Sequence, residues 1–133
     1  MEERPFTAYT PLVYAYVGDA VFETVVRTVL ALRGYSHPKN MNQSAVHYVN
    51  AAAQAFMADA VAEELTAEEA GVMRRGRNAN PGTTAKHASV ADYRKATGME
   101  ALTGFLFLSG KEERLSELIR LGMEAYDRKE EQE

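Results

Sequence analysis

Apolar residues recur at a helical spacing along most of the chain, and this pattern predicts an all-α fold. The first predicted helix opens at Thr10 and Pro11, a favourable N-cap and first-position pair. It runs to about Arg33, where Gly34 can end it. Its β-branched residues would also suit a strand, but the length of the segment and its clean cap favour a helix.

Further helices are predicted after a loop over residues 35–40. A second long helix is expected from about Asn42 to Leu65. Thr66 and Glu69 then form a capping box for a short third helix that ends near Arg74.

Residues 75–88, RGRNANPGTTAKHA, are rich in Gly, Asn, Pro and Thr and predict a long loop. Ser89 can cap the next helix, which continues to about Ser109. A final helix is expected from about Glu112 to Asp127, followed by a frayed tail.

Length and composition indicate one globular domain. The chain has 133 residues, of which 46% are hydrophobic and 26% charged. No repeat or linker divides it, so we expect a single domain over residues 1–133 with its core at about 9–126.

The absence of cysteine excludes disulfides and zinc-thiolate sites and fits a cytoplasmic protein. The N-terminal MEERPFTAYT does not resemble a signal peptide, and no apolar stretch is long enough to predict a membrane span.

Charge is distributed unevenly along the chain. The net charge of −4 argues at first sight against a nucleic-acid partner. Residues 59–69, however, hold five acidic residues and no basic one, whereas residues 74–95 hold six basic residues and one acidic one. A local basic segment can bind phosphate on an acidic protein, so a nucleic-acid partner stays open.

Two carboxylates lie in apolar helical segments beside glycines. Asp19 follows Gly18 within VYAYVGDAVFETVV, and Glu100 lies between Gly98 and Gly104 in ATGMEALTGFLFLSG. A glycine inside a helix costs about 1 kcal/mol relative to alanine, so we expect another group to approach the backbone closely beside Asp19. Two carboxylates that face each other across a helix pair could hold Mg²⁺, which takes oxygen ligands and keeps several waters.

The alternative for Asp19 is a carboxylate at the edge of the core that an arginine or a backbone donor satisfies. Glu23 lies one turn later and could join Asp19 in a paired site, although a solvated or salt-bridged role is commoner at such a position. The residues alone leave both alternatives open.

The basic segment offers side chains that could contact phosphate and sugar oxygens. The candidate RNA-binding residues are Arg74, Arg75, Arg77, Asn78, Lys86, Arg94 and Lys95. The alternative is a solvated surface loop, with arginines that favour the dipole at a helix C-terminus.

Several ordered blocks of the sequence resemble the ribonuclease III family, and in particular its short Mini-III branch. VYAYVGDAVFE resembles the family signature around Leu-Gly-Asp-Ala, and MEALTGFLFLSGKEERLSELI resembles the second acidic motif with its Glu-Ala-Leu-x-Gly pattern. RRGRNA, GTTAK and YRKATGMEAL are typical of the Mini-III branch. The match covers the chain from about Tyr9 to Tyr126.

The resemblance implies a homodimeric, all-α ribonuclease III catalytic-domain-like fold. It implies hydrolysis of double-stranded RNA with Mg²⁺ as cofactor, or Mn²⁺ in its place, leaving 5′-phosphate ends. It makes Asp19 and Glu100 the metal-binding and catalytic acids, with one site per protomer. It also makes Gly18 the space through which a metal or RNA approaches, and the basic segment the surface that contacts RNA. For the Mini-III branch it implies maturation of the 23S ribosomal RNA precursor in a bacterium, with no double-stranded-RNA-binding domain after the catalytic one.

Two positions depart from full-length ribonuclease III. The glutamate that the larger enzymes place four residues before Asp19 is Ala15, and the aspartate that they place three residues before Glu100 is Thr97. Mini-III sequences share such losses. Waters, a backbone carbonyl or an RNA phosphate could complete the metal shell, so the number of metal ions stays open.

Two other functions stay open on the sequence. A non-catalytic ribonuclease III-like module could bind structured RNA or ribosomal particles, but such a module has no need of two carboxylates near a polyanion. An all-α nucleotide hydrolase would require a denser acidic motif than Asp19 and Glu100 provide.

Overall fold

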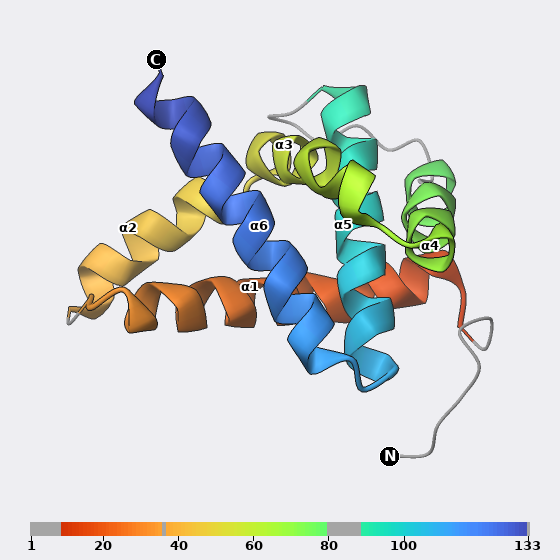
Figure 1. The fold of residues 1–133 in the computed structure, drawn as a ribbon, viewed down its shortest axis with the longest axis horizontal. Coiled ribbons are helices and arrows are strands. Elements are labelled where there is room, and N and C mark those ends of the chain that lie inside the picture. Colours follow the sequence, from red (N-terminus) through yellow and green to blue (C-terminus); the bar gives the residue numbers. More distant parts are fainter. Residues whose placement is uncertain (1–8, 36, 80–88, 133) are drawn as a thin grey trace.

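The computed structural model describes residues 9–35, 37–79 and 89–132 of the chain, and Figure 1 shows their arrangement. The helices are α1 (Pro11–Leu32), α2 (Pro38–Val49), α3 (Ala51–Val61), the short 3-10 helix η2 (Ala62–Glu64), α4 (Ala67–Asn78), α5 (Val90–Leu108) and α6 (Glu112–Glu131). These described residues contain no strand, so the all-α prediction is confirmed. None of their helices is long and apolar enough to cross a membrane.

The start of α1 follows the prediction. The Thr10 hydroxyl accepts a hydrogen bond from the Val13 N–H at 3.3 Å, and Pro11 occupies the first helical turn. Beyond the other end, Gly34 has a φ of 94°, a left-handed conformation that glycine adopts without steric cost. Local sequence signals therefore place both ends of α1.

The single helix predicted from Asn42 to Leu65 is wrong, because this segment forms two helices. The first, α2, begins earlier, at Pro38, within the segment predicted as a loop. It ends before Asn50, whose extended backbone carries the chain into α3. The Asn50 side chain accepts a hydrogen bond from the Ala53 N–H at 2.9 Å and so caps α3.

Two predicted helix ends are also too early. The helix expected to end near Arg74 continues to Asn78, so the first residues of the predicted loop belong to α4. Arginines in its last turn favour this extension because they interact well with the helix dipole. The final helix continues past Asp127 to Glu131, so the tail predicted as frayed is largely helical. Residues 80–88 of the predicted loop lie outside the described residues.

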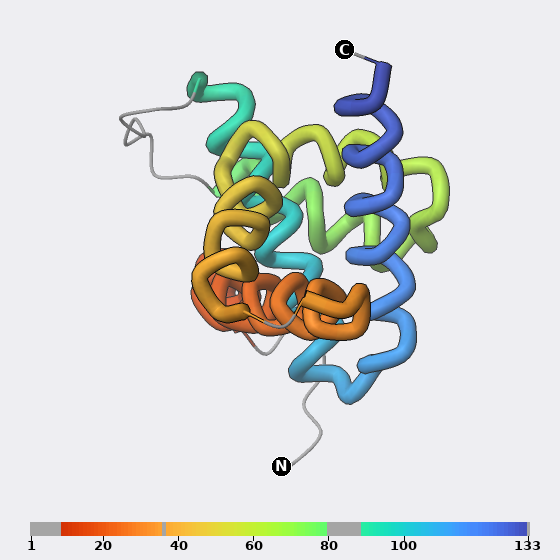
Figure 2. Tube along the Cα trace, turned by 90° about the vertical axis from the view of Figure 1, so that its left-hand side faces the viewer, coloured from red at the N-terminus to blue at the C-terminus, as the bar shows by residue number. Residues whose placement is uncertain are grey.

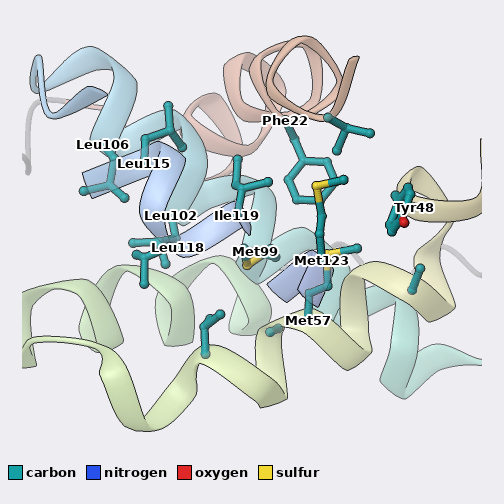
Figure 3. Packing of buried hydrophobic residues seen from close by; sticks show 14 of the residues in the cluster. Phe22, Tyr48, Met57, Met99, Leu102, Leu106, Leu115, Leu118, Ile119 and Met123 are labelled. Carbon is teal, nitrogen blue, oxygen red and sulfur yellow. The ribbon is translucent and has the colours of Figure 1, made fainter. Parts of the chain in front are cut away.

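The central helix is α5, which packs against α1, α3 and α4 (Figure 1). Its buried side chains include Met99, Leu102 and Phe105. The view in Figure 2 shows α6 running along the other side of the molecule from the start of α5. Figure 3 shows Phe22 of α1 and Met123 of α6 close together in the core. The apolar character of α5 on all sides, visible in the sequence, follows from this central position.

Glycines allow α1 and α5 to cross with their backbones in contact. A Cβ atom added at Gly18 would overlap the carbonyl oxygen of Glu100, and one added at Gly104 would overlap the carbonyl oxygen of Tyr14. The group that approaches the backbone at Gly18 is therefore α5. The expectation that Gly18 leaves room for a metal or RNA is wrong, and its role is to let the two helices meet.

A buried ion pair connects the start of α4 to α6. Glu69 is 4% exposed and completes the predicted capping box with Thr66. Arg114 donates from Nε to Glu69 Oε2 at 2.9 Å and from Nη2 to Oε1 at 2.8 Å. These hydrogen bonds lower the pKa of the Glu69 carboxyl because they favour its charged form. Glu69 thus has a structural role, and stability should fall as the pH drops far enough to protonate it.

Candidate active site

The crossing of α1 and α5 places Asp19 beside Glu100. Asp19 follows Gly18, whose backbone lies against the carbonyl group of Glu100. The Asp19 side chain is close enough to act on the Glu100 carboxyl and to change its pKa. The structure therefore brings together the two acidic residues that the sequence singled out, and Asp19 has Glu100 as a partner in place of an arginine.

The two carboxyl groups differ in their surroundings. Glu100 is half-buried in α5, whereas Asp19 is exposed although the segment around it is apolar. Burial, a hydrogen bond that the protonated Glu100 carboxyl donates to Asp19, and the negative charge of Asp19 raise the pKa of Glu100 to about 8. At pH 7 the pair consequently retains a proton, as expected for two carboxyl groups that cannot both ionise at close range.

The donor set of this pair fits a divalent cation that prefers oxygen ligands. A bound cation would take the place of the shared proton and offset the repulsion between the two carboxylates. Mg²⁺ commonly binds through one or two carboxylates and keeps several waters. Asp19 and Glu100 therefore suit a cation whose remaining ligands are water or substrate oxygens.

No third acid joins the pair in the described ranges, where no group of three His, Cys, Asp or Glu residues converges. Ala15 and Thr97 occupy the positions at which the larger enzymes carry acids, and both are buried. The Thr97 hydroxyl donates to the carbonyl of Tyr93 at 3.0 Å. Glu23 pairs with Arg27 at 2.8 Å, which is the salt-bridged role weighed against a paired site.

Three of the predicted RNA-binding residues lie together at a hollow on the surface. Arg74, Arg77 and Lys95 line one hollow of about 260 Å³ between α3, α4 and α5, which we call the basic hollow. Lys95 precedes Glu100 by five residues on α5, so the two side chains point about 140° apart around the helix. The basic hollow and the carboxylate pair therefore lie on different faces of α5.

The other predicted RNA-binding residues are distributed more widely. Asn78 at the end of α4 and Arg94 near the start of α5 are exposed. Arg75 is also exposed, and its charge acts on Tyr14 of α1. Lys86 lies outside the described residues. The sequence reasoning missed Asp59, which lines the basic hollow and pairs with Lys95 at 2.8 Å.

Comparison with known proteins decides the family. The model of the ribonuclease III domain matches residues 12–111. The chain belongs to the ribonuclease III family. The Mini-ribonuclease 3 of Brevibacillus brevis is 46% identical over 110 residues, which cover 83% of this chain and 82% of that protein. The Mini-ribonuclease 3 of Enterococcus faecalis is 45% identical over 118 residues, covering 87% and 89%.

A solved structure shares this fold. The crystal structure of a Fusobacterium nucleatum protein superimposes with a TM-score of 0.76 at 27% sequence identity. The match covers 89% of this chain and 94% of the other. The resemblance to the Mini-III branch is thus confirmed, and the protein is an endoribonuclease of the ribonuclease III type. Ribonuclease III proteins act on double-stranded RNA, generally depend on divalent metal ions and typically form dimers.

Proposed function

We propose that the protein is a homodimeric, Mg²⁺-dependent endoribonuclease that matures the 23S ribosomal RNA precursor in the cytoplasm. The observation that carries the proposal is the α1–α5 crossing, which places Asp19 beside Glu100. The similarity to proteins named Mini-ribonuclease 3 supports the assignment to ribosomal RNA.

Asp19 and Glu100 would hold Mg²⁺, or Mn²⁺ in its place. The metal, when bound, lowers the pKa of a coordinated water and offsets negative charge on the phosphate in the transition state. Glu100 must give up its proton to serve as a ligand, and its half-buried position fixes the direction of its carboxylate. Asp19 is exposed, so RNA can reach it from solvent.

Cleavage of a duplex RNA fragment from a 23S precursor, with and without Mg²⁺, tests the proposal. We expect cuts in both strands that leave 5′-phosphate ends, and no cuts when EDTA removes the metal. Binding of the duplex without cleavage in either Mg²⁺ or Mn²⁺ would contradict the proposal and favour a non-catalytic RNA-binding module.

Exposed apolar residues on α1 support the proposed homodimer. Leu12, Val13 and Tyr16 are 41%, 42% and 82% exposed. Further along the same helix, Val21 and Leu32 contribute to an apolar hollow of about 390 Å³ between α1, the end of α5 and α6. Exposed apolar surfaces of this kind often mark interfaces, and we assign this one to a second copy of the chain.

The variant Tyr16→Asp is expected to weaken the dimer because it places a charge in the proposed apolar interface. Sedimentation should give twice the 14.7 kDa mass of one chain for the parent and a shift towards that single mass for the variant. Val46→Asp is a matched control, since Val46 is 63% exposed on α2. A monomeric parent at micromolar concentration would contradict the proposed homodimer.

The double variant Arg74→Ala/Arg77→Ala is expected to weaken RNA binding and its dependence on salt. Each phosphate contact contributes about 0.9 to the slope of log affinity against log salt in a duplex, so loss of two contacts should reduce the slope by about 2. Duplex binding measured in EDTA over a range of salt concentrations checks this. An unchanged slope would show that these arginines do not contact the backbone of the RNA.

A further inference from the structure

The basic hollow combines three cations with one acid. Arg74 and Arg77 of α4 and Lys95 of α5 share it with Asp59 of α3. Residues with apolar side chains, among them Leu65 and Met73, line the rest. In the part of the chain that the structure describes, Arg74 and Arg77 form no ion pair with an acidic side chain. Asp59 is thus the acid of the basic hollow, and it pairs with Lys95.

The ion pair between Asp59 and Lys95 is of a kind that exchanges readily. Lys95 Nζ lies 2.8 Å from Asp59 Oδ2, but the two side chains are 36% and 62% exposed. Solvent screens such a pair, so that it contributes little to stability and can be replaced at small cost. A phosphate oxygen presents the same negatively charged acceptor to a lysine ammonium group as a carboxylate does.

The position of Asp59 within α3 has no benefit for the helix itself. Asp59 lies in the last turn of α3, which ends at Val61, where the helix dipole disfavours an acid. The side chain is also too exposed to contribute to the core. In the described part of the chain, the side-chain interaction of Asp59 is the hydrogen bond that it accepts from Lys95.

We propose that Asp59 competes with RNA phosphate for Lys95 and thereby limits the affinity of the protein for RNA. The inference rests on the proposed function, because it takes Arg74, Arg77 and Lys95 as contacts to the RNA backbone. Duplex RNA displaces Asp59 from Lys95 when its phosphates also reach the two arginines. An anion that reaches Lys95 alone faces competition from a carboxylate already in place.

The variant Asp59→Asn tests this by removing the charge with little change of shape. In EDTA, which prevents cleavage, its affinity for duplex RNA should rise about two- to fivefold at low salt. The slope of log affinity against log salt should steepen by up to about 1. Without Asp59, Lys95 is free to neutralise one more phosphate, and the counterion of that phosphate is released from the RNA. The gain should vanish in the background of Lys95→Met, since the competition requires both residues.

Glu63→Gln is the matched control. Glu63 is an exposed acid in η2, one turn beyond Asp59, and it does not line the basic hollow. Its removal changes the net charge equally, so it should raise affinity by less than Asp59→Asn does. An equal gain from both variants would overturn the inference, because the effect would then be one of net charge.

The remaining outcomes separate the inference from the function on which it rests. If Asp59→Asn leaves affinity unchanged while Arg74→Ala/Arg77→Ala weakens binding, the competition is refuted and the RNA surface stands. If neither change alters binding, the proposed RNA surface itself fails, and the inference fails with it. A loss of affinity together with a lower melting temperature would show that Asp59 has a structural role, which also overturns the inference.

Discussion

Asp19→Asn and Glu100→Gln are each expected to lower the rate of duplex RNA cleavage in Mg²⁺ by at least about 100-fold. Each change replaces a charged oxygen ligand with a neutral amide of similar shape. Metal ions contribute several kcal/mol of charge stabilisation in the transition state, and each 1.36 kcal/mol corresponds to a factor of ten in rate. Single-turnover cleavage measures the chemical step without product release.

Two controls separate loss of a ligand from loss of the fold. Glu23→Gln removes an acid one turn further along α1 that pairs with Arg27, so it should cleave at a rate close to that of the parent.

Without metal, Glu100→Gln should be at least as stable as the parent at pH 8. The raised pKa of Glu100 means that the folded protein holds this proton more tightly than the unfolded chain. The protonated Glu100 carboxyl therefore contributes its full stabilisation of the fold at low pH, and this contribution is lost as the pH rises towards 8. Parental cleavage by a folded Glu100→Gln would refute the assignment.

Gly104→Ala is expected to cost about 3 kcal/mol of folding free energy or more. The added Cβ would overlap the carbonyl oxygen of Tyr14, and neither backbone can move without separating α1 from α5. For a chain of this length the melting temperature should fall by about 10 °C or more. Because the same crossing holds Glu100 beside Asp19, any folded fraction should also cleave more slowly.

Gly71→Ala provides the control for this glycine substitution. Gly71 also lies within a helix, but the nearest group to an added Cβ is the flexible guanidinium of Arg75, 3.3 Å away. Alanine is the better helix former by about 1 kcal/mol, so the melting temperature should stay the same or rise. Equal losses from Gly71→Ala and Gly104→Ala would show that glycine has no special role at the α1–α5 crossing.

The ends of helices were predictable where a short local signal sets them. The hydroxyl of Thr10 and the capping box of Thr66 with Glu69 act over three residues and are formed as expected. The division of α2 from α3 was missed because Asn50 interrupts a segment with helical spacing on both sides. An asparagine is also tolerated inside helices, so its capping role becomes evident only from the backbone conformation.

The carboxylate pair was predicted from two acids that each lie near glycine in an apolar segment. The reason for the glycines was not predictable from either segment alone, because it is the contact of one helix with the other. The difference in burial between Asp19 and Glu100 was not predictable for a similar reason. The sequence shows that α1 is apolar around Asp19, but the direction of the side chain depends on where α5 crosses.

The basic segment was the least predictable part of the candidate site. Closely spaced arginines and lysines indicate a basic region but do not reveal which of them share a face. Lys95 and Glu100 lie on different sides of α5, and Asp59 comes from a helix that the charge pattern marked only as acidic. A pairing between distant segments leaves no signature within either of them.

Binding of Mg²⁺, measured by isothermal titration calorimetry with the parent and with Glu100→Gln, tests the central assignment most directly. We expect the parent to bind the ion more tightly at pH 8.5 than at pH 6.5, because a proton competes with the metal below the pKa of Glu100, about 8. The variant should show no comparable binding at either pH. Equal Mg²⁺ binding by the parent and Glu100→Gln would contradict a metal site at Asp19 and Glu100.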